Sequence, residues 1–396
     1  MDRQKQSSVS EHDKMIRKAI YTREDETVLI ENGREWNFHE ADTQEHLHAL
    51  HPYPAKFIPQ IPRKAIRAWT KKGELVYDPF VGCGTTLLEA CILGRSSIGT
   101  DNNPIAILVS KAKTTCYSTA DISALRAFAY EVDQKLPNLR PQRNLIPNNK
   151  NFLYWFSKEI LGGLSALKSM ILAKPEPIRT ILLAVFSSII IRLSFQDSDT
   201  RYAKIEREVK PADIAKIFKG KLADVVKRIP EVIVPQRAPV AVHLADARNV
   251  PFIESNSVSL IVTSPPYLNA YDYHKYHRQR IHWIDGNIEF ARDMEIGSHD
   301  EFTKPNARPD KYFTDMDACF SEWWRVVKKG GRCLVVIGDA IVSKRPVYVA
   351  DTFIDLVVRR GFRLERHWIR ELHSTKRTFN IRNSRISHEH LLLFKK

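Results

Sequence analysis

The chain contains 396 residues, of which 43% are hydrophobic, so it can bury a substantial core and is not an intrinsically disordered protein. Its 61 Lys and Arg residues outnumber its 46 Asp and Glu residues, which gives a formal net charge of +15. This excess predicts attraction to polyanions, with nucleic acid first among them, although a basic soluble surface would have the same composition. The length suits one large domain with an insertion, or two domains.

Cysteine spacing argues against a protein held together by disulfides or a cysteine metal site, and the length of the apolar runs argues against a membrane-spanning protein. The five cysteines are scattered and no pair has C-x-x-C spacing, so we expect reduced thiols, no disulfide framework and no metal site. The N-terminus has no apolar signal core. The longest apolar run, residues 180–191, is shorter than the roughly 20 residues that a membrane span needs, which predicts a buried helix.

The first half of the chain predicts an arm followed by an α/β unit. Residues 1–46 are polar and mixed in charge, and we expect a partly disordered N-terminal arm. Prolines in residues 51–59 exclude a regular helix there. Strand and helix then alternate, which favours a parallel α/β sheet. The expected elements are helix 63–71, strand 74–77, helix 87–93, strand 97–100 and helix 104–113.

The second half predicts a helical insertion and a return to the sheet. Residues 136–150 are rich in Pro and Asn, as in a linker, and the apolar spacing that follows is helical. We therefore divide the chain into a catalytic domain, residues 47–116 and 238–396, and a helical insertion, residues 117–237. The expected elements are helices 154–170, 178–195 and 211–228, strands 240–244 and 257–263, helix 316–327, strand 333–337, helix 349–359 and strand 391–394.

A glycine-containing loop follows the first strand, in the sequence Asp78-Pro-Phe-Val-Gly-Cys-Gly-Thr-Thr86. Glycine lets the backbone approach a ligand closely because it has no Cβ. The dinucleotide fingerprint needs a third glycine where Leu87 stands, and a phosphate-binding loop needs Gly-Lys-Ser/Thr, so both patterns fail here. The loop therefore suits a nucleoside ligand without a diphosphate, with a purely structural turn as the alternative.

Acidic residues follow the ends of three expected strands: Asp78, Asp101 and Asp246. Asp101 is placed to accept hydrogen bonds from ribose hydroxyls, and Asp246 to accept from an adenine amino group. S-adenosylmethionine fits this pattern. Helix capping explains any one of these acids alone, but all three at strand ends favour a ligand.

The sequence Thr263-Ser-Pro-Pro-Tyr267 follows a buried, β-branched strand, so it should open at the carboxyl edge of the sheet, where α/β folds bind ligands. The prolines fix the backbone and remove two donors, so carbonyls and the Ser264 hydroxyl face a guest as acceptors. An exocyclic amine offers two N–H donors to such a surface, and Tyr267 offers a flat face for a base. A tight Pro-Pro turn without function is the alternative.

Such a loop suits methyl transfer to the amino group of cytosine or adenine. The lone pair of this nitrogen is delocalised into the ring, and acceptors for both N–H groups localise it so that it can attack a sulfonium methyl group. Positioning and electrostatics then supply most of the catalysis, and no strong base is required. Methylation at cytosine C5 instead needs a nucleophilic cysteine, usually in Pro-Cys, and the chain contains no Pro-Cys.

With these motifs the chain resembles the S-adenosylmethionine-dependent amino-methyltransferases of DNA, and the cytosine-N4 group most. The resemblance rests on residues 78–86, 101–104 and 263–267, and on 51–57, which are similar to the segment that closes over the methionine part of the cofactor. It implies a Rossmann-like class I methyltransferase with a mostly parallel seven-stranded sheet and an inserted all-helical subdomain. Serine at the first loop position favours cytosine, but some adenine enzymes also carry it.

The resemblance also implies roles for matching positions. Ser264 and the Pro265 carbonyl would bind the target amine, Tyr267 would stack on the flipped base, and Phe80 would lie near the methionine moiety. The implied catalytic set is Ser264, Pro265, Pro266 and Tyr267. The implied cofactor-binding set is Tyr53, Pro54, Lys56, Phe57, Asp78, Pro79, Phe80, Gly82, Gly84, Thr85, Thr86, Asp101, Asn102, Asp246 and Ala247.

A base inside a duplex must be flipped out to reach such a pocket, which requires contacts to the DNA. Residues 271–280 interleave aromatic and basic side chains, as in a nucleic-acid-binding face or in a solvated helix with an inward aromatic stripe. A basic tract at 359–385 and a polar break at 196–202 are further candidates. The predicted DNA-binding residues are Tyr271, Lys275, Tyr276, Arg278, Arg280, Arg201, Lys376, Arg377 and Arg382.

We therefore expect a prokaryotic, cytoplasmic enzyme that methylates double-stranded DNA at cytosine N4, with a cognate restriction endonuclease as a candidate partner. Adenine-N6 methylation of DNA is the first alternative. An RNA amino-methyltransferase and a catalytically inactive nucleic-acid-binding protein are the others.

Overall fold

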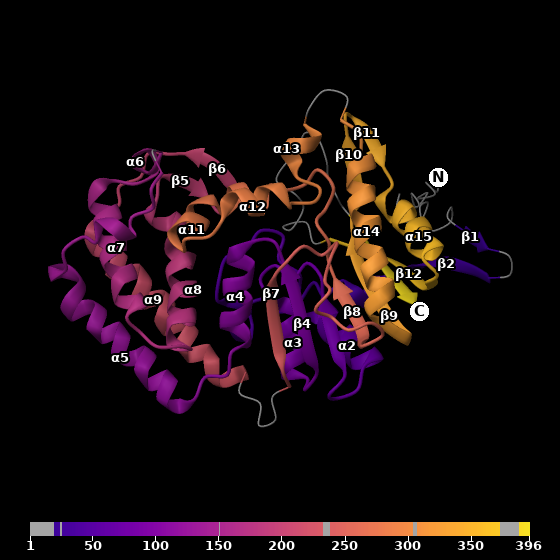
Figure 1. Ribbon diagram of the computed structural model, residues 1–396, viewed down its shortest axis with the longest axis horizontal. Helices are drawn as coiled ribbons and strands as arrows, with labels where there is room; N and C mark the ends of the chain where they lie inside the picture. The colour runs from indigo at the N-terminus through magenta and orange to yellow at the C-terminus, as the bar shows by residue number, and fades with distance from the viewer. Residues whose placement is uncertain (1–19, 24–25, 150, 233–237, 304–306, 373–387) are drawn as a thin grey trace, which may run out of the picture.

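A nine-stranded sheet forms the centre of the computed structural model, which describes residues 20–23, 26–149, 151–232, 238–303, 307–372 and 388–396 (Figure 1). In spatial order the strands are β1 (Ile20–Arg23), β2 (Glu26–Asn32), β12 (Arg363–Glu371), β13 (His388–Lys395), β9 (Val327–Ile337), β8 (Val258–Thr263), β3 (Leu75–Asp78), β4 (Ser96–Asp101) and β7 (Val240–Leu244). The strands from β9 to β7 run parallel, whereas β13 is antiparallel to both of its neighbours. The predicted mostly parallel α/β sheet of seven strands is thus present, with β2 and β1 added at one edge.

Helices cover both faces of this sheet, so its central strands are apolar on both sides. On one face α2 (Gln60–Trp69) packs Ile61 and Ile66 against Val76 and Leu260. On the other face α14 (Asp310–Val326) and α15 (Val349–Arg359) pack beneath the opposite side chains of the same strands. The connections α3 (Thr85–Ile92) and α4 (Pro104–Thr114) complete the alternation that the sequence predicts.

The insertion has a hydrophobic core of its own, on the left of Figure 1. Its helices are α5 (Thr119–Lys135), α6 (Phe152–Trp155), α7 (Lys158–Leu172), α8 (Ile178–Ile189) and α9 (Pro211–Arg228). The predicted all-helical character needs a correction, because β5 (Gln196–Ser198) and β6 (Arg201–Lys204) form an antiparallel pair. The same core includes Leu88 of α3 and Ala112 of α4, so the insertion is packed firmly onto the catalytic domain.

The described part of the N-terminal region departs from the prediction of a partly disordered arm. Strand β2 pairs in parallel with β12, and Trp36 is 1% exposed between Trp69 and Trp368. The described part of residues 1–46 is therefore built into the sheet edge, while residues 1–19 lie outside the described residues.

Short elements cross the carboxyl edge of the sheet and join the insertion to the region around α14 (Figure 1). They are α10 (Tyr273–Tyr276), α11 (Arg278–Trp283), α12 (Ile288–Asp293), α13 (His299–Phe302) and the hairpin of β10 (Ala340–Val342) with β11 (Arg345–Val347). None of the helices in the described ranges is long and apolar enough to cross a membrane.

Candidate active site

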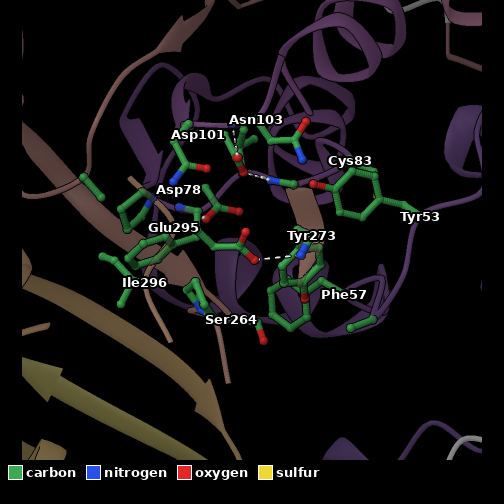
Figure 2. A pocket seen from close by; sticks show the side chains of 18 of the residues that line it. Tyr53, Phe57, Asp78, Cys83, Asp101, Asn103, Ser264, Tyr273, Glu295 and Ile296 are labelled. Carbon is green, nitrogen blue, oxygen red and sulfur yellow. Dashed lines mark hydrogen bonds between the residues drawn. The ribbon is translucent and has the colours of Figure 1, made fainter. Parts of the chain in front are cut away.

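One pocket at the carboxyl edge of the sheet brings most of the predicted site residues together (Figure 2). Parallel strands end at the same edge, so the loops after β3, β4, β7 and β8 meet there. The pocket is lined by Tyr53, Pro54, Lys56, Phe57, Asp78, Pro79, Phe80, Gly82, Thr85, Asp101, Asn102, Asp246 and Ala247, and by Ser264 and Pro266 of the second motif. The cofactor motif and the catalytic motif therefore share a cavity.

The glycine loop needs its two glycines for different reasons. Gly82 has φ +48° and Gly84 has φ +77°, a region in which other residues are strained. A Cβ on Gly84 would lie 2.7 Å from the Ser110 hydroxyl oxygen of α4, so Gly84 packs behind the loop and does not line the pocket. Gly82 lines the pocket, and its N–H points at the next strand's acid.

That acid is Asp101, whose carboxylate already holds the loop in place. Its Oδ2 accepts the Gly82 N–H at 2.9 Å, and its Oδ1 accepts the Asn103 N–H at 2.9 Å. Burial raises the pKa of Asp101 to about 7, despite these two backbone donors. Each carboxylate oxygen keeps a lone pair for a further donor, as ribose hydroxyls would supply.

Asp78 links the glycine loop to the strand that carries the catalytic motif. The Thr263 hydroxyl donates to its Oδ1 at 2.7 Å, and the Phe80 N–H donates to the same oxygen at 3.1 Å. Burial raises the pKa of Asp78 to about 6. Thr86, which does not line the pocket, donates to the Val262 carbonyl at 3.3 Å. These contacts fix the distance between the two motifs.

Asp246 lines the pocket, but Arg248 donates hydrogen bonds to both oxygens of its carboxylate. Arg248 Nε lies 3.0 Å from Asp246 Oδ1 and 2.9 Å from Oδ2, and Arg248 Nη1 also donates to Asp315 at 2.5 Å. An ionised carboxylate has about four acceptor sites. The Arg248 backbone N–H also donates to Oδ1 at 2.9 Å, and Arg248 Nη2 lies 2.8 Å from Oδ2, so Arg248 occupies the acceptor sites of Asp246 and sets its orientation.

The catalytic motif leaves β8 with every residue of that strand buried. Ser264 and Pro266 line the pocket, while Pro265 is buried beneath them. The Tyr312 hydroxyl donates to the Pro266 carbonyl at 2.9 Å, which anchors the loop to α14. Tyr267 does not line the same cavity; its hydroxyl donates to Glu389 Oε1 at 2.6 Å and lies 3.5 Å from Ser264 Oγ.

Several pocket residues have no motif in the sequence that would have revealed them. Figure 2 shows Tyr273 and Glu295 facing the same cavity as Asp101. Glu295 accepts the N–H groups of Tyr273 at 2.7 Å and of His274 at 3.2 Å, so it holds α10 over the pocket. These contacts depend on tertiary packing alone. Ala245, Met294 and Ile296 are further lining residues outside any motif, whereas Ala55, Val81, Cys83 and Asn103 lie inside the motifs without having been named as site residues.

The segment before α2 closes another side of the pocket. The Tyr53 ring lies 6.1 Å from the Tyr273 ring and 4.7 Å from the His277 ring, measured between centroids. Lys56 Nζ donates to the His48 carbonyl at 2.8 Å, and burial lowers the pKa of Lys56 to about 8. This wall therefore presents aromatic faces and one ammonium group.

The predicted DNA-binding residues divide into four groups. Arg280 requires a correction: it is fully buried, and it donates to the Ser187 carbonyl at 3.0 Å and to Asp199. Lys275 forms ion pairs with Asp272 and Asp300. Arg201 is 73% exposed, whereas Tyr271, Tyr276 and Arg278 are partly exposed. Lys376, Arg377 and Arg382 lie outside the described residues.

Comparison with known proteins gives consistent relatives. A family model described as DNA methylase, of the N6/N4 type, matches residues 2–111. The type II methyltransferase M.MvaI of Kocuria varians is 25% identical over 66% of this chain and 62% of its own length. M.BsoBI of Geobacillus stearothermophilus, also a type II methyltransferase, is 23% identical over 65% of this chain and 56% of its own. The chain thus spans less than two thirds of the length of these relatives.

Solved structures give more distant likenesses. An S-adenosylmethionine-dependent methyltransferase from Methanosarcina mazei is 11% identical over 87% of this chain and 98% of its own, with a TM-score of 0.33. A TehB-like S-adenosylmethionine-dependent methyltransferase from Corynebacterium glutamicum is 12% identical over 85% and 86%, with a TM-score of 0.31. At these TM-scores the likenesses support no conclusion about function.

The sheet order and the pocket at its carboxyl edge define a Rossmann-like α/β fold with its ligand site where such folds bind ligands. The family model over residues 2–111 and the type II relatives make this chain similar to N4/N6 DNA amino-methyltransferases.

S-adenosylmethionine is the cofactor that the sequence motifs imply, and the residues of the pocket fit it. Asp101 offers carboxylate oxygens for ribose hydroxyls, and the glycine backbone at Gly82 leaves room for close approach. Phe80 and Tyr53 supply apolar walls, and Lys56 supplies a cation for a carboxylate. In the part of the chain that the structure describes, no group of three or more His, Cys, Asp or Glu side chains is arranged to hold a metal ion.

Proposed function

We propose that this chain methylates double-stranded DNA at the exocyclic N4 amine of a flipped cytosine. The observation that carries the proposal is the shared pocket, in which Ser264 and Pro266 lie in one cavity with Gly82 and Asp101. A methyl donor held by the second pair would meet a base amine held by the first. The family match and the type II relatives support DNA as the substrate.

The chain's own residues act by positioning. S-adenosylmethionine supplies, when bound, a methyl group on a positively charged sulfur. Ser264 Oγ would accept one amine N–H bond. The carbonyl of Pro265, the buried residue between the two that line the pocket, would accept the other, so that the nitrogen lone pair is directed out of the ring. The bound cofactor would supply the methyl group by cleavage of its S–C bond, with the electron pair returning to sulfur, and the amine would release its surplus proton to water. Asp101 and Lys56 hold the donor in line.

Serine at the first position of the catalytic loop supports cytosine over adenine, and adenine N6 is the second candidate because it presents the same two N–H donors. To distinguish them, the protein is incubated with labelled S-adenosylmethionine and mixed-sequence DNA, and the nucleosides are identified by mass spectrometry. N4-methylcytosine is the expected product. If N6-methyladenine were found instead, the target base would be adenine and not cytosine. Label in RNA alone would reject DNA as the substrate.

Ser264→Ala tests the role of the loop hydroxyl. It removes one acceptor for the target amine and leaves the cofactor wall intact, so we expect turnover to fall about 100-fold. The dissociation constant for S-adenosylmethionine, measured by calorimetry, should stay within about twofold. A twofold change corresponds to a loss of about 0.4 kcal/mol in binding free energy. A variant that loses cofactor affinity and keeps its turnover would contradict this role.

A cognate restriction endonuclease and a cytoplasmic location remain predictions that follow from the same proposal. Co-purification of an endonuclease that cleaves the unmethylated target, and not the methylated one, would support the first.

A further inference from the structure

We propose that Glu389, at the start of β13, is a positioning residue that sets the hydrogen-bond direction of the catalytic loop through Tyr267. The proposal rests on the proposed function and adds a residue to it. Glu389 lies 122 positions after Tyr267, and antiparallel β13 brings it to the carboxyl edge where β8 ends. Its side chain is 11% exposed, and its carboxylate accepts from the Tyr267 hydroxyl at 2.6 Å.

Arg370 holds this carboxylate from the neighbouring strand. Arg370 Nε donates to Glu389 Oε2 at 2.7 Å, its Nη2 lies within ion-pair distance of the same oxygen, and its Nη1 donates to the Trp36 carbonyl at 3.2 Å. The guanidinium compensates the buried charge and leaves Oε1 to the tyrosine. The carboxylate is thus fixed in orientation before any substrate arrives.

A paired carboxylate can only accept hydrogen bonds, and this fixes the donor and acceptor roles along the chain of hydroxyls. Tyr267 must donate its proton to Glu389; burial and the nearby Glu389 charge hold the pKa of Tyr267 well above its usual value, so that proton stays on the ring. The Tyr267 oxygen then accepts from Ser264 Oγ, which lies 3.5 Å away. With its proton turned toward Tyr267, Ser264 presents only lone pairs to the pocket.

That direction is what an amine target needs, because a serine hydroxyl can otherwise donate as well as accept. A Ser264 proton turned into the pocket would oppose the N–H groups of the base. Glu389 therefore converts an ambiguous hydroxyl into an acceptor, at a distance of three hydrogen bonds from the reacting nitrogen.

The test compares Glu389→Gln, Tyr267→Phe and the double variant in single-turnover methyl transfer. We expect each single variant to slow transfer about 10- to 100-fold, and the double variant to be no slower than the slower single one, because both break the same chain. The dissociation constant for S-adenosylmethionine should change less than about twofold. An unchanged rate in Glu389→Gln, or effects that multiply in the double variant, would overturn the proposal.

Glu365→Gln is the matched control. Glu365 also pairs with an arginine on this sheet, accepting from Arg332 Nε at 2.6 Å, but at the opposite end of β12. The Glu365→Gln variant should transfer methyl groups at the rate of the unmodified protein. Glu389→Asp keeps the acceptor and should recover part of the rate, which separates lost direction from lost folding.

A spectroscopic readout keeps the proposal independent of the assigned substrate. With tyrosine labelled by carbon-13 at Cζ, the resonance missing from Tyr267→Phe identifies Tyr267. We expect that resonance to shift in Glu389→Gln and to stay in place in Glu365→Gln. If the unmodified protein methylates no DNA, the proposed function fails; if the resonance is unmoved in Glu389→Gln, this inference fails by itself.

Discussion

Asp101 has two roles that depend on its protonation. As a carboxylate it accepts two backbone N–H groups that shape the glycine loop, and it offers the acceptor that ribose hydroxyls require. Burial opposes that charge and raises the pKa of Asp101 to about 7. Near neutral pH the free protein therefore contains both ionised Asp101, which accepts hydrogen bonds from ribose hydroxyls, and protonated Asp101, which has fewer acceptor sites.

Cofactor affinity should for this reason depend on pH. A bound ribose stabilises the ionised form, so affinity is complete above pH 7 and is lost as the pH falls through 7. We expect the dissociation constant for S-adenosylmethionine at pH 6 to be about tenfold weaker than at pH 7.5, by the linkage of one proton. Calorimetric titration across this range measures it.

Asp101→Asn is the control for this pH dependence. The amide cannot titrate, so its weaker binding should be level between pH 6 and pH 7.5. A slope equal to that of the unmodified protein would assign the titration to another group, such as Asp78, whose pKa burial raises to about 6.

At the scale of the elements, the sequence correctly predicted those strands and turns whose conformation depends on adjacent residues. The β-branched run before Thr263 became β8, and the glycine loop after Tyr77 became the turn into α3, because both depend on adjacent residues. Strand β12 and the edge strand β2 were not predicted, since their partners are distant in sequence. Glu295 and Glu389 reach the site for the same reason, through tertiary contacts that leave no motif.

Two arginines show most clearly what the sequence cannot predict, because Arg201 and Arg280 were both predicted to bind DNA. Arg280 is buried between α8 and the turn of the β5–β6 hairpin, where it donates to Ser187 and Asp199. Arg201 projects from that hairpin and is 73% exposed. The first arginine thus joins elements, whereas the second is exposed and pairs only with Asp197 of its own hairpin among the contacts in the described residues.

Substitution by alanine should separate these two roles. Arg280→Ala removes buried packing and hydrogen bonds, and we expect the free energy of unfolding to fall by about 2–4 kcal/mol. Arg201→Ala loses one exposed ion pair, and the change should stay within about 0.5 kcal/mol. Urea denaturation followed by circular dichroism measures both values; equal effects would contradict the assignment.

On the scale of the whole molecule, two hairpins flank the pocket. Figure 1 shows β5–β6 on the insertion and β10–β11 beside α14, both at the carboxyl edge. The second hairpin is tied to the catalytic loop, because Asn269 Nδ2 donates to the Ile341 carbonyl at 2.7 Å. Its turn has positive φ at Ser343 (+49°) and Lys344 (+63°), as the tight turns of two-residue hairpins require.

A tight hairpin of this kind presents the side chains at its tip rigidly, and here they are the exposed Lys344 and Arg345. Pro346 lacks an N–H, which makes the hairpin a poor edge for another protein strand. A two-stranded ribbon with cations at its tip instead fits the groove and phosphates of a duplex. If the proposed function holds, this hairpin should grip the DNA on the side of the pocket away from the insertion.

The salt dependence of DNA binding tests that grip. The double variant Lys344→Ala/Arg345→Ala should flatten the slope of log Kd against log salt by about 1.8, because each phosphate contact contributes about 0.9. Lys71→Ala/Lys72→Ala removes the same charge from exposed positions just before β3, at the opposite edge of the sheet, and should leave the slope unchanged. Equal slopes for the two variants, measured by fluorescence anisotropy, would mean that only net charge attracts the duplex and that the hairpin makes no contact.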